Sequence, residues 1–446
     1  MRILIVGAGD IGFQLSRRLF RERIDITIVE SDPVRAQRAR EQMDAIVIEG
    51  HGASIRTLHD AGIAECDLVA AMTDNDEVNL IACLAAKNAG VQTTIARVRN
   101  PELMEKDCPL TAATLGVDHF IHPEQETADM IVRLIRQAST TDIIEFEEGK
   151  VQLVGVRLDA DSPLLRVPLA ELVRQHGDPP MRVVAIVRNQ TTIIPGGDDT
   201  LVPGDHIFSV CAPDYIPEFI AHTGKKDINI NDVMILGGGL VGQFIARRLS
   251  GKKNVKIVES DSDKSRDIAV KLPDTLIIQG DGTDIDLMAV EGLQDMDAFV
   301  AVTGDDETNI ISTLLARHLK VPRTIALVNK VEYLPITPGI GMDAVVSKQL
   351  LTVNAVYRHI QAQEVAAVAS VPGIDAHIIE YIVEPTDKIA RKPLKDIDFP
   401  RQAVIGAVMR GDEYIIPRGD THIRSGDRVI VFTLPGSLSA VEKLFK

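Results

Sequence analysis

Residues 2–12 read RILIVGAGDIG, an aliphatic run that leads into a glycine-rich turn. Residues 232–242 read DVMILGGGLVG and repeat this arrangement 230 positions later. Each turn follows a predicted strand and opens a predicted helix, and an acidic residue ends the next strand, at Glu30 in the first copy and Glu259 in the second. A GxGxxG turn in this context predicts a dinucleotide-binding Rossmann-type domain in each copy.

Other segments repeat as well, which indicates a duplicated pair of domains. One example is TDNDEVN at 73–79, which recurs 230 residues later as TGDDETN at 303–309. Another is IIP at 193–195, which recurs 222 residues later at 415–417. A period this long indicates domain duplication and not a solenoid, whose repeats span about 20–50 residues.

Strand and helix patterns alternate in the first part of each copy, which is typical of a parallel, doubly wound α/β sheet. The second part of each copy has short β-like runs separated by turns rich in Gly, Asp and Pro, so we expect a small α+β domain there. The linker between the copies is predicted at 225–231. The predicted domains are residues 1–139, 140–224, 230–361 and 362–446.

The composition narrows the class of protein. The 446 residues carry a net charge of −16, which argues against nucleic acid as a partner because phosphate binding needs clustered Lys and Arg. The four cysteines lack CxxC spacing and indicate a reducing compartment. No signal peptide precedes the first strand, and no apolar run reaches the roughly 18 residues that span a bilayer. We therefore expect a cytosolic protein.

The glycines of each turn have separable roles. The first permits the tight turn, the second leaves room for a pyrophosphate, and the third lets the helix pack on its strand. These glycines are Gly7, Gly9 and Gly12 in the first copy, and Gly237, Gly239 and Gly242 in the second. Backbone N–H groups near Ile11 and Val241 should face the phosphates, because a helix N-terminus favours anions. Glu30 and Glu259 can accept hydrogen bonds from a ribose diol and would repel a 2′-phosphate, which favours NAD(H) or ATP/ADP over NADP(H).

Further contacts are expected beyond the carboxyl ends of the other strands, where ligands of such sheets bind. Thr73 and Asp74 follow the fourth strand, Arg97 ends the fifth, and Asp281 follows the third strand of the second copy. An ordinary polar surface is the alternative for each of them. The predicted cofactor-binding set is Gly7, Ala8, Gly9, Asp10, Ile11, Gly12, Glu30, Thr73, Asp74 and Arg97, with Gly237, Gly238, Gly239, Leu240, Val241, Gly242, Glu259, Asp281 and Thr303.

The quoted turn and TDNDEVN, together with IARVRNPE at 95–102 and IHPE at 121–124, resemble the RCK (regulator of conductance of potassium) nucleotide-binding domain. The segments IIPGGDDTLVPGD at 193–205 and IIPRGDTHIRSGD at 415–427 resemble the small RCK C-terminal domain. Two such pairs in one chain resemble the TrkA family, the regulatory subunits of Trk potassium uptake systems. The resemblance covers essentially the whole chain.

The resemblance implies binding of NAD(H), and also of ATP or ADP. It implies a peripheral protein on the inner face of the membrane, assembled as a ring-like homo-oligomer beneath a Trk-type potassium-translocating subunit. Helices at 125–137 and 349–361 match the family's crossover helices, although an ordinary core-facing helix explains their apolar spacing equally well. The second copy departs from the pattern, because Leu327 replaces Arg97 and SKQ at 347–349 replaces HPE.

Two other functions stay open, an NAD-dependent oxidoreductase and a sensor for a different transporter. An oxidoreductase needs an acid or base that faces the nicotinamide. The histidines His119 and His122 are expected in a strand-to-helix loop, where spacing implies no carboxylate partner. No Cys/His cluster accompanies them, and turn formation explains aspartates such as Asp205 and Asp427 better than cation binding. We therefore predict no catalytic residue and no metal site.

Overall fold

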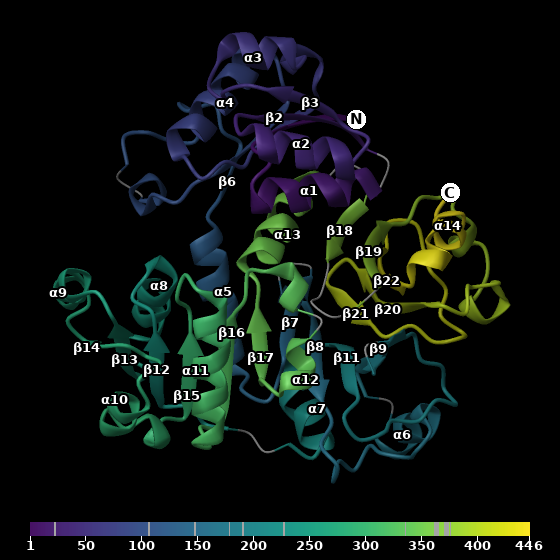
Figure 1. Cartoon of the computed structure of the whole chain (residues 1–446). Coiled ribbons are helices and arrows are strands. Elements are labelled where there is room, and N and C mark those ends of the chain that lie inside the picture. Colours follow the sequence, from purple (N-terminus) through teal and green to yellow (C-terminus); the bar gives the residue numbers. More distant parts are fainter. Residues whose placement is uncertain are drawn as a thin grey trace. The chain divides into compact units, whose positions relative to one another are not determined.

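The computed structural model describes residues 1–446 except 22–23, 106–107, 147–148, 178, 190, 226–227, 335, 361–364, 370–373 and 375. In these described ranges the strands form four sheets (Figure 1). By its internal contacts the chain divides into one unit of residues 1–127 and 348–360, and another of residues 128–347 and 361–446.

The first unit contains a six-stranded parallel sheet in the order β3-β2-β1-β4-β5-β6. Its strands are β1 (Arg2–Val6), β2 (Asp25–Glu30), β3 (Ile46–Glu49), β4 (Leu68–Ala71), β5 (Thr93–Arg97) and β6 (His119–Ile121). The helices between them are α1 (Asp10–Arg21), α2 (Pro33–Gln42), α3 (Ile55–Asp60) and α4 (Asp76–Asn88). The strand order reverses between β1 and β4, and such a switch point is where doubly wound sheets bind ligands.

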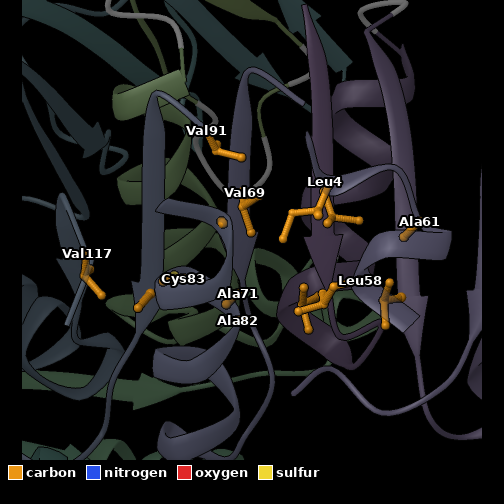
Figure 2. Close-up of a cluster of buried hydrophobic side chains, with 14 of the residues drawn as sticks. Leu4, Leu58, Ala61, Val69, Ala71, Ala82, Cys83, Val91 and Val117 are labelled. Carbon is orange, nitrogen blue, oxygen red and sulfur yellow. The ribbon is translucent and has the colours of Figure 1, made fainter. Parts of the chain in front are cut away.

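Small aliphatic side chains fill the layer between this sheet and the helices α3 and α4. Leu4 and Val69 of the strands are fully buried, as are Ala82 and Cys83 of α4. Figure 2 shows these side chains together with Leu58 of α3. Burial raises the pKa of the Cys83 thiol to about 12, so this cysteine behaves as a small hydrophobic residue.

The second unit repeats the first sheet strand for strand, in the order β14-β13-β12-β15-β16-β17. Its strands are β12 (Asp232–Leu236), β13 (Asn254–Glu259), β14 (Leu276–Gln279), β15 (Ala298–Ala301), β16 (Arg323–Leu327) and β17 (Ala344–Val346). Its helices are α8 (Leu240–Leu249), α9 (Ser262–Lys271), α10 (Ile285–Val290), α11 (Asp306–His318) and α12 (Thr337–Ile340). The two parallel sheets confirm the predicted duplication of a doubly wound α/β fold.

The second unit also contains two five-stranded antiparallel sheets, ordered β10-β9-β11-β8-β7 and β18-β19-β22-β20-β21. The first is built from β7 (Asp142–Phe146), β8 (Val151–Arg157), β9 (Met181–Arg188), β10 (Thr191–Ile193) and β11 (His206–Cys211), with α6 (Leu169–Gln175) and α7 (Ile216–His222). The second is built from β18 (Val365–Ala369), β19 (His377–Ile382), β20 (Ala403–Arg410), β21 (Glu413–Ile415) and β22 (Arg428–Thr433), with α14 (Leu438–Glu442). These sheets confirm the predicted small α+β domains.

The two antiparallel sheets share one hydrophobic cluster. Phe208 and Val210 of β11 pack in it with Met409 of β20 and Phe432 of β22. All four side chains are almost completely buried. The small domains therefore stabilise each other through a common core, which the sequence pattern did not indicate.

The aspartates of the small-domain turns are bound by arginines. Asp205 accepts hydrogen bonds from Arg188 Nε (2.8 Å) and Nη2 (2.7 Å). Asp427 accepts the equivalent bonds from Arg410, at 2.9 and 2.7 Å. Each carboxylate also accepts a backbone N–H of its own turn. Turn formation therefore accounts for both residues.

Short 3-10 helices complete the connections. They are η1 (Ile63–Glu65), η2 (Pro101–Met104), η4 (Pro213–Tyr215), η5 (Leu293–Asp295), η6 (Val331–Tyr333), η7 (Lys388–Ala390), η8 (Leu394–Asp396) and η9 (Pro435–Ser437). The predicted linker includes residues 226–227, and the predicted second crossover helix includes residue 361, both outside the described residues. The four domain boundaries stay a prediction. In the described part of the chain, no helix is both long and apolar enough to cross a bilayer.

Helix α13 (Lys348–Ile360) follows the second parallel sheet in sequence but belongs to the first unit. It packs there against α1. Tyr357 is fully buried, and the Arg18 guanidinium lies 3.9 Å from its ring centroid. Arg18 Nη1 also donates to Asn354 Oδ1 at 2.7 Å. These contacts tie α13 to the helix that starts at the first glycine turn.

Helix α5 (Pro123–Arg136) makes the matching contact in the second unit, to which its residues from Ala128 onward belong. Arg248 of α8 stands 230 positions after Arg18 and pairs with the carboxylate of Asp129. Each of these helices therefore contacts the first helix of the other copy, α13 by packing on α1 and α5 through the ion pair of Asp129 with Arg248. The placement of α13 agrees with the crossover interpretation, which stays a prediction for α5.

Tyr357→Ala should destabilise the first unit by about 3 kcal/mol or more, because it removes a fully buried aromatic ring and leaves a cavity. Hydrogen exchange should rise in residues 348–360, and the thermal unfolding temperature should fall. Arg358→Ala is the matched control, because its half-exposed pair with Glu126 at 3.6 Å contributes at most about 1 kcal/mol. Equal effects of the two substitutions would contradict this account of α13.

Candidate functional site

The turn between β1 and α1 depends on its glycines. Gly7 has φ +99°, and a Cβ there would lie 2.9 Å from Thr73 Cγ2. A Cβ on Gly12 would lie only 1.9 Å from the carbonyl oxygen of Gly7. The third glycine is therefore required by the turn itself, and not mainly by contact between helix and strand as predicted. A Cβ on Gly9 would meet only Arg35 Nη1, at an ordinary 3.6 Å, so this position opens onto free space.

The turn between β12 and α8 has the same construction. A Cβ on Gly242 would lie 2.1 Å from the carbonyl oxygen of Gly237, whereas a Cβ on Gly239 would meet nothing within 4 Å. The residue between the first two glycines is Ala8 in the first copy and Gly238 in the second. A Cβ on Gly238 would lie 2.4 Å from Ile268 Cδ1, so alanine has no room there. In both copies the second glycine is thus the open position, as the fingerprint predicts.

Helices α1 and α8 begin directly at the turns. The carbonyl of Gly9 accepts from the Phe13 N–H (2.8 Å), and the carbonyl of Gly239 accepts from the Gln243 N–H (3.0 Å). The first N–H groups of a helix have no acceptor within it and favour an anion. These groups belong to Asp10, Ile11 and Gly12 in α1, and to Leu240, Val241 and Gly242 in α8.

Glu30 closes the first glycine turn. Its side chain is only 5% exposed, and its Oε2 accepts from the Ala8 N–H at 2.5 Å. Its Oε1 accepts from the Asp32 N–H at 2.8 Å, just before α2. The carboxylate predicted to accept from a ribose therefore also holds the turn against the end of β2.

Glu259 makes the equivalent bonds to the N–H groups of Gly238 (2.9 Å) and Asp261 (3.1 Å). In addition it forms an ion pair with Lys264 of α9. Burial alone would raise the pKa of Glu259, but the hydrogen bonds from Lys264 and the two amides outweigh it and hold the pKa below its usual 4.5. The first copy has another basic residue, Arg35, at the position of Lys264, since each donates its N–H to the N-cap aspartate of its helix, and the sequence analysis missed both.

A buried asparagine that the sequence analysis also missed organises the loop after β4. The N–H and hydroxyl of Thr73 donate to Asn79 Oδ1, at 3.0 and 2.7 Å. Asn79 Nδ2 donates to the carbonyls of Thr73 (3.0 Å) and Arg97 (2.8 Å). Asn309 makes the same bonds in the second copy. An asparagine ends the repeated segment in both copies, and this repetition could have identified the residue from the sequence.

Arg97 lies at the end of β5, as predicted, beside this loop. Its Nη1 donates to the carbonyl of Thr73 at 3.1 Å, while its buried Nε has no hydrogen-bond partner in the described part of the chain. Burial lowers the pKa of Arg97 and the carboxylate of Glu124 acts against that change, but a guanidinium stays charged at neutral pH. A partly buried cation with an unused donor at the switch point fits an anionic ligand. Asp74, which follows Thr73 in the same loop, is exposed.

The loops after the third strands are occupied by turn contacts. Asp281 Oδ1 accepts from the N–H and the hydroxyl of Thr283, both at 2.8 Å, and these bonds lower the pKa of Asp281. His51 stands at the same place in the first copy, and its Nδ1 accepts from the Ala53 N–H at 3.2 Å. Both side chains are exposed. Contact of Asp281 with a nucleotide stays a prediction.

Of the two histidines expected in a strand-to-helix loop, only His122 lies there, between β6 and α5. His119 belongs to β6, and its ring stacks on His359 of α13 with centroids 3.8 Å apart. His122 is buried, and its Nδ1 lies 3.7 Å from Glu124 Oε2. The expectation that no carboxylate accompanies them was wrong, because α5 starts at Pro123 and turns Glu124 back toward His122. Burial lowers the pKa of His122, although Glu124 acts against that change.

The ion pair between Glu259 and Lys264 should make the second unit sensitive to acid. The pKa of Glu259 lies below 4.5 in the folded chain, so its stabilisation is complete above that pH and is lost as the pH falls through the depressed pKa. Lys264→Met should therefore reduce the loss of stability between about pH 5 and 3, measured as the urea midpoint. Arg266→Met, on the exposed face of the same helix, should leave the loss unchanged. Identical acid profiles for wild type and Lys264→Met would contradict this assignment.

Comparison with known proteins agrees with this architecture. The TrkA-N domain family matches residues 3–123 and 233–348, and the TrkA-C domain family matches residues 153–224 and 378–446. The Trk system potassium uptake protein TrkA homolog 1 of Methanosarcina mazei is 35% identical, over 100% of both chains. The Trk system potassium uptake protein TrkA of Haemophilus influenzae is 32% identical, over 100% of this chain and 99% of that one.

The fold is also shared with a solved structure, the GsuK channel bound to NAD. That chain superposes with a TM-score of 0.62 at 18% identity, over 100% of this chain and 78% of that one. At this level of identity the likeness shows the fold. The family models and the full-length relatives together show more: this chain belongs to the TrkA family, with two TrkA-N and two TrkA-C domains.

Proposed function

We propose that this chain is a nucleotide-sensing regulatory subunit of potassium uptake. It binds NAD(H), or ATP and ADP, at its glycine turns and acts on a Trk-type potassium-translocating membrane subunit. The observation that carries this proposal is that Gly9 and Gly239 are the glycines of their turns where a side chain would meet open space, whereas the other turn glycines have no room for one. The relatives named as Trk potassium uptake proteins and the NAD-bound GsuK channel support it.

In the first copy, the open position at Gly9 admits the negatively charged phosphates of the nucleotide. The ribose diol of the same nucleotide then lies beside Glu30. The N–H groups of residues 10–12 bind the phosphates, and Glu30 accepts from the ribose. Thr73 and Asp74 flank the nucleotide from the neighbouring loop. Arg97 adds a fixed positive charge through its unused Nε. Ala8 and Gly7 shape the turn.

The second copy binds through Gly239 and the N–H groups of residues 240–242, with Glu259, Asp281 and Thr303 around them. Its affinity is expected to be lower, because Leu327 brings no charge and Glu259 is already bound to Lys264. A ribose can use that carboxylate only by competing with the lysine. The two copies therefore report different nucleotide concentrations or different nucleotides.

Coupling to the membrane partner runs through α1. This helix begins at the glycine turn, and its Arg18 binds Asn354 and covers Tyr357 of α13. A nucleotide shifts the state of the protein only by its differential affinity for two arrangements of these helices. Coupling of about 1–3 kcal/mol per site is typical, and equivalent sites add in a ring-like homo-oligomer on the inner face of the membrane. We place its functional domains at 1–139, 140–224, 230–361 and 362–446.

Gly9→Leu should abolish nucleotide binding at the first copy alone, and Gly239→Leu at the second alone. Each new side chain fills the open position without a backbone clash, so folding should be retained. Gly12→Leu should instead disrupt the fold, because its Cβ meets the Gly7 carbonyl at 1.9 Å. Calorimetric titration with NADH and ATP measures binding, and circular dichroism measures folding. Gly196→Leu is the matched control, with a Cβ contact at 3.7 Å outside the turns. Loss of both sites from one substitution would contradict independent sites.

The regulatory role predicts that nucleotide binding controls transport and drives no chemistry. Potassium uptake should be restored in cells that lack their own regulatory subunit when wild type is expressed with its membrane partner, and Gly9→Leu should reduce the uptake. Purified protein should not oxidise NADH in the presence of carbonyl compounds. Turnover in that assay would favour the oxidoreductase alternative. Unchanged uptake with Gly9→Leu would separate nucleotide binding from regulation.

A further inference from the structure

A polar cavity of about 480 Å³ lies in the second unit, away from its glycine turn. Arg323, which lines it, is the first residue of β16, whereas the glycine turn follows the last residue of β12. The strands of this sheet run parallel, so the cavity lies at their amino ends and the glycine turn at their carboxyl ends. The cavity is therefore a separate place for a ligand.

Three arginines line the cavity, namely Arg157 at the end of β8, Arg317 in α11 and Arg323. In the described ranges none of the three forms an ion pair with a carboxylate. Arg323 is only 3% exposed, and its Nη2 donates to the carbonyls of Thr140 (2.5 Å) and Leu134 (3.4 Å). Its Nε is buried and has no hydrogen-bond partner within the part of the chain that the structure describes.

Nearby carboxylates act on these guanidiniums without pairing with them: Asp142 on Arg157 and Arg323, and Asp343 on Arg323. Lys225 lines the cavity too and pairs with Asp159 at 2.8 Å. Asp343 Oδ2 accepts from the N–H (2.8 Å) and hydroxyl (2.7 Å) of Thr324. Asp161 is exposed. With the Lys225 pair set aside, the cavity lining has three guanidiniums and the two carboxylates of Asp161 and Asp343, while Asp142 lies behind the lining and is bound to His206 at 3.3 Å.

Arg317 and Arg323 have no arginine counterpart in the parallel-sheet domain of the first copy, so that fold does not require them. The residues 230 positions earlier are Lys87 for Arg317 and Thr93 for Arg323. Lys87 is neutralised there by Asp118, with 2.7 Å between Nζ and Oδ2. Burying an arginine without a carboxylate destabilises a protein unless something else offsets it. A bound anion would provide that offset in the second copy.

We propose that this cavity binds a phosphate-bearing anion. The planar guanidinium presents paired N–H groups that match phosphate oxygens, which makes arginine the preferred side chain for such ligands. Arg157 comes from the first antiparallel sheet, while Arg317 and Arg323 come from the second parallel sheet. The bound anion therefore fastens these two parts of the second unit to each other. The inference does not depend on nucleotide binding at the glycine turns.

The test is calorimetric titration of the full chain carrying Gly9→Leu and Gly239→Leu, which silence the glycine turns, with pyrophosphate as the probe. One site per chain is expected, with an affinity that falls as the salt concentration rises. Arg157→Gln and Arg317→Gln should each weaken binding roughly ten- to a hundredfold. Arg266→Gln, an equal charge change on exposed α9, should have no effect. Arg323 is left intact because its bonds to two backbone carbonyls are structural.

A second titration with ATP identifies the source of the phosphate. Competition between ATP and pyrophosphate with the same arginine dependence indicates a nucleotide, and binding of pyrophosphate alone indicates a free phosphate anion. No binding of either probe would overturn the inference, and so would binding that survives the double Arg157→Gln, Arg317→Gln variant. Failure of the proposed nucleotide sensing would appear separately, as absent NADH binding to the wild-type chain.

Discussion

The hydrogen bond between a buried glutamate and an amide of the glycine turn is the contact on which each parallel sheet depends. Glu30 binds the N–H of Ala8, and Glu259 binds that of Gly238. Each bond joins the carboxyl ends of two adjacent strands, so the turn cannot open away from the sheet. The helix must then start at once, and its first N–H groups face the switch point. The helix start supplies N–H donors to this region, and the carboxylate supplies an acceptor beside them.

The glycine turns and the strand order were predictable because both are local properties. Spacing alone places a glycine where a side chain would meet the carbonyl of Gly7, and an acidic residue at the end of the following strand. The contacts of Asn79 and Lys264 were not predictable in the same way, because spacing does not show which side chains the sheet edge brings together. Comparing the copies position by position would have marked both, one as a retained asparagine and the other as a position that is basic in each copy, Arg35 and Lys264.

Two further contacts could not be predicted from the sequence, one at a strand-to-helix turn and one between two sheets. His122 and Glu124 are two residues apart, and only the start of α5 between them determines that their side chains meet. The common core of the antiparallel sheets escaped prediction because an inward-facing strand side has the same pattern whichever sheet covers it. The alternation of elements fixed the class of each domain but could not show that the two small domains share Phe208 and Phe432.

Helix α13 follows the second parallel sheet in sequence but packs in the first unit, and this exchange between the copies affects folding during synthesis. The first sheet is synthesised early, but the helix that covers Arg18 begins only at Lys348, after residues 128–347 of the other unit. On a ribosome that delay is on the order of ten to forty seconds, during which the outer side of α1 lacks its final neighbour. Contacts this distant in sequence slow folding. Keeping both copies in one polypeptide makes the exchange an internal event with a high effective concentration, where two half-length chains would have to find each other by diffusion.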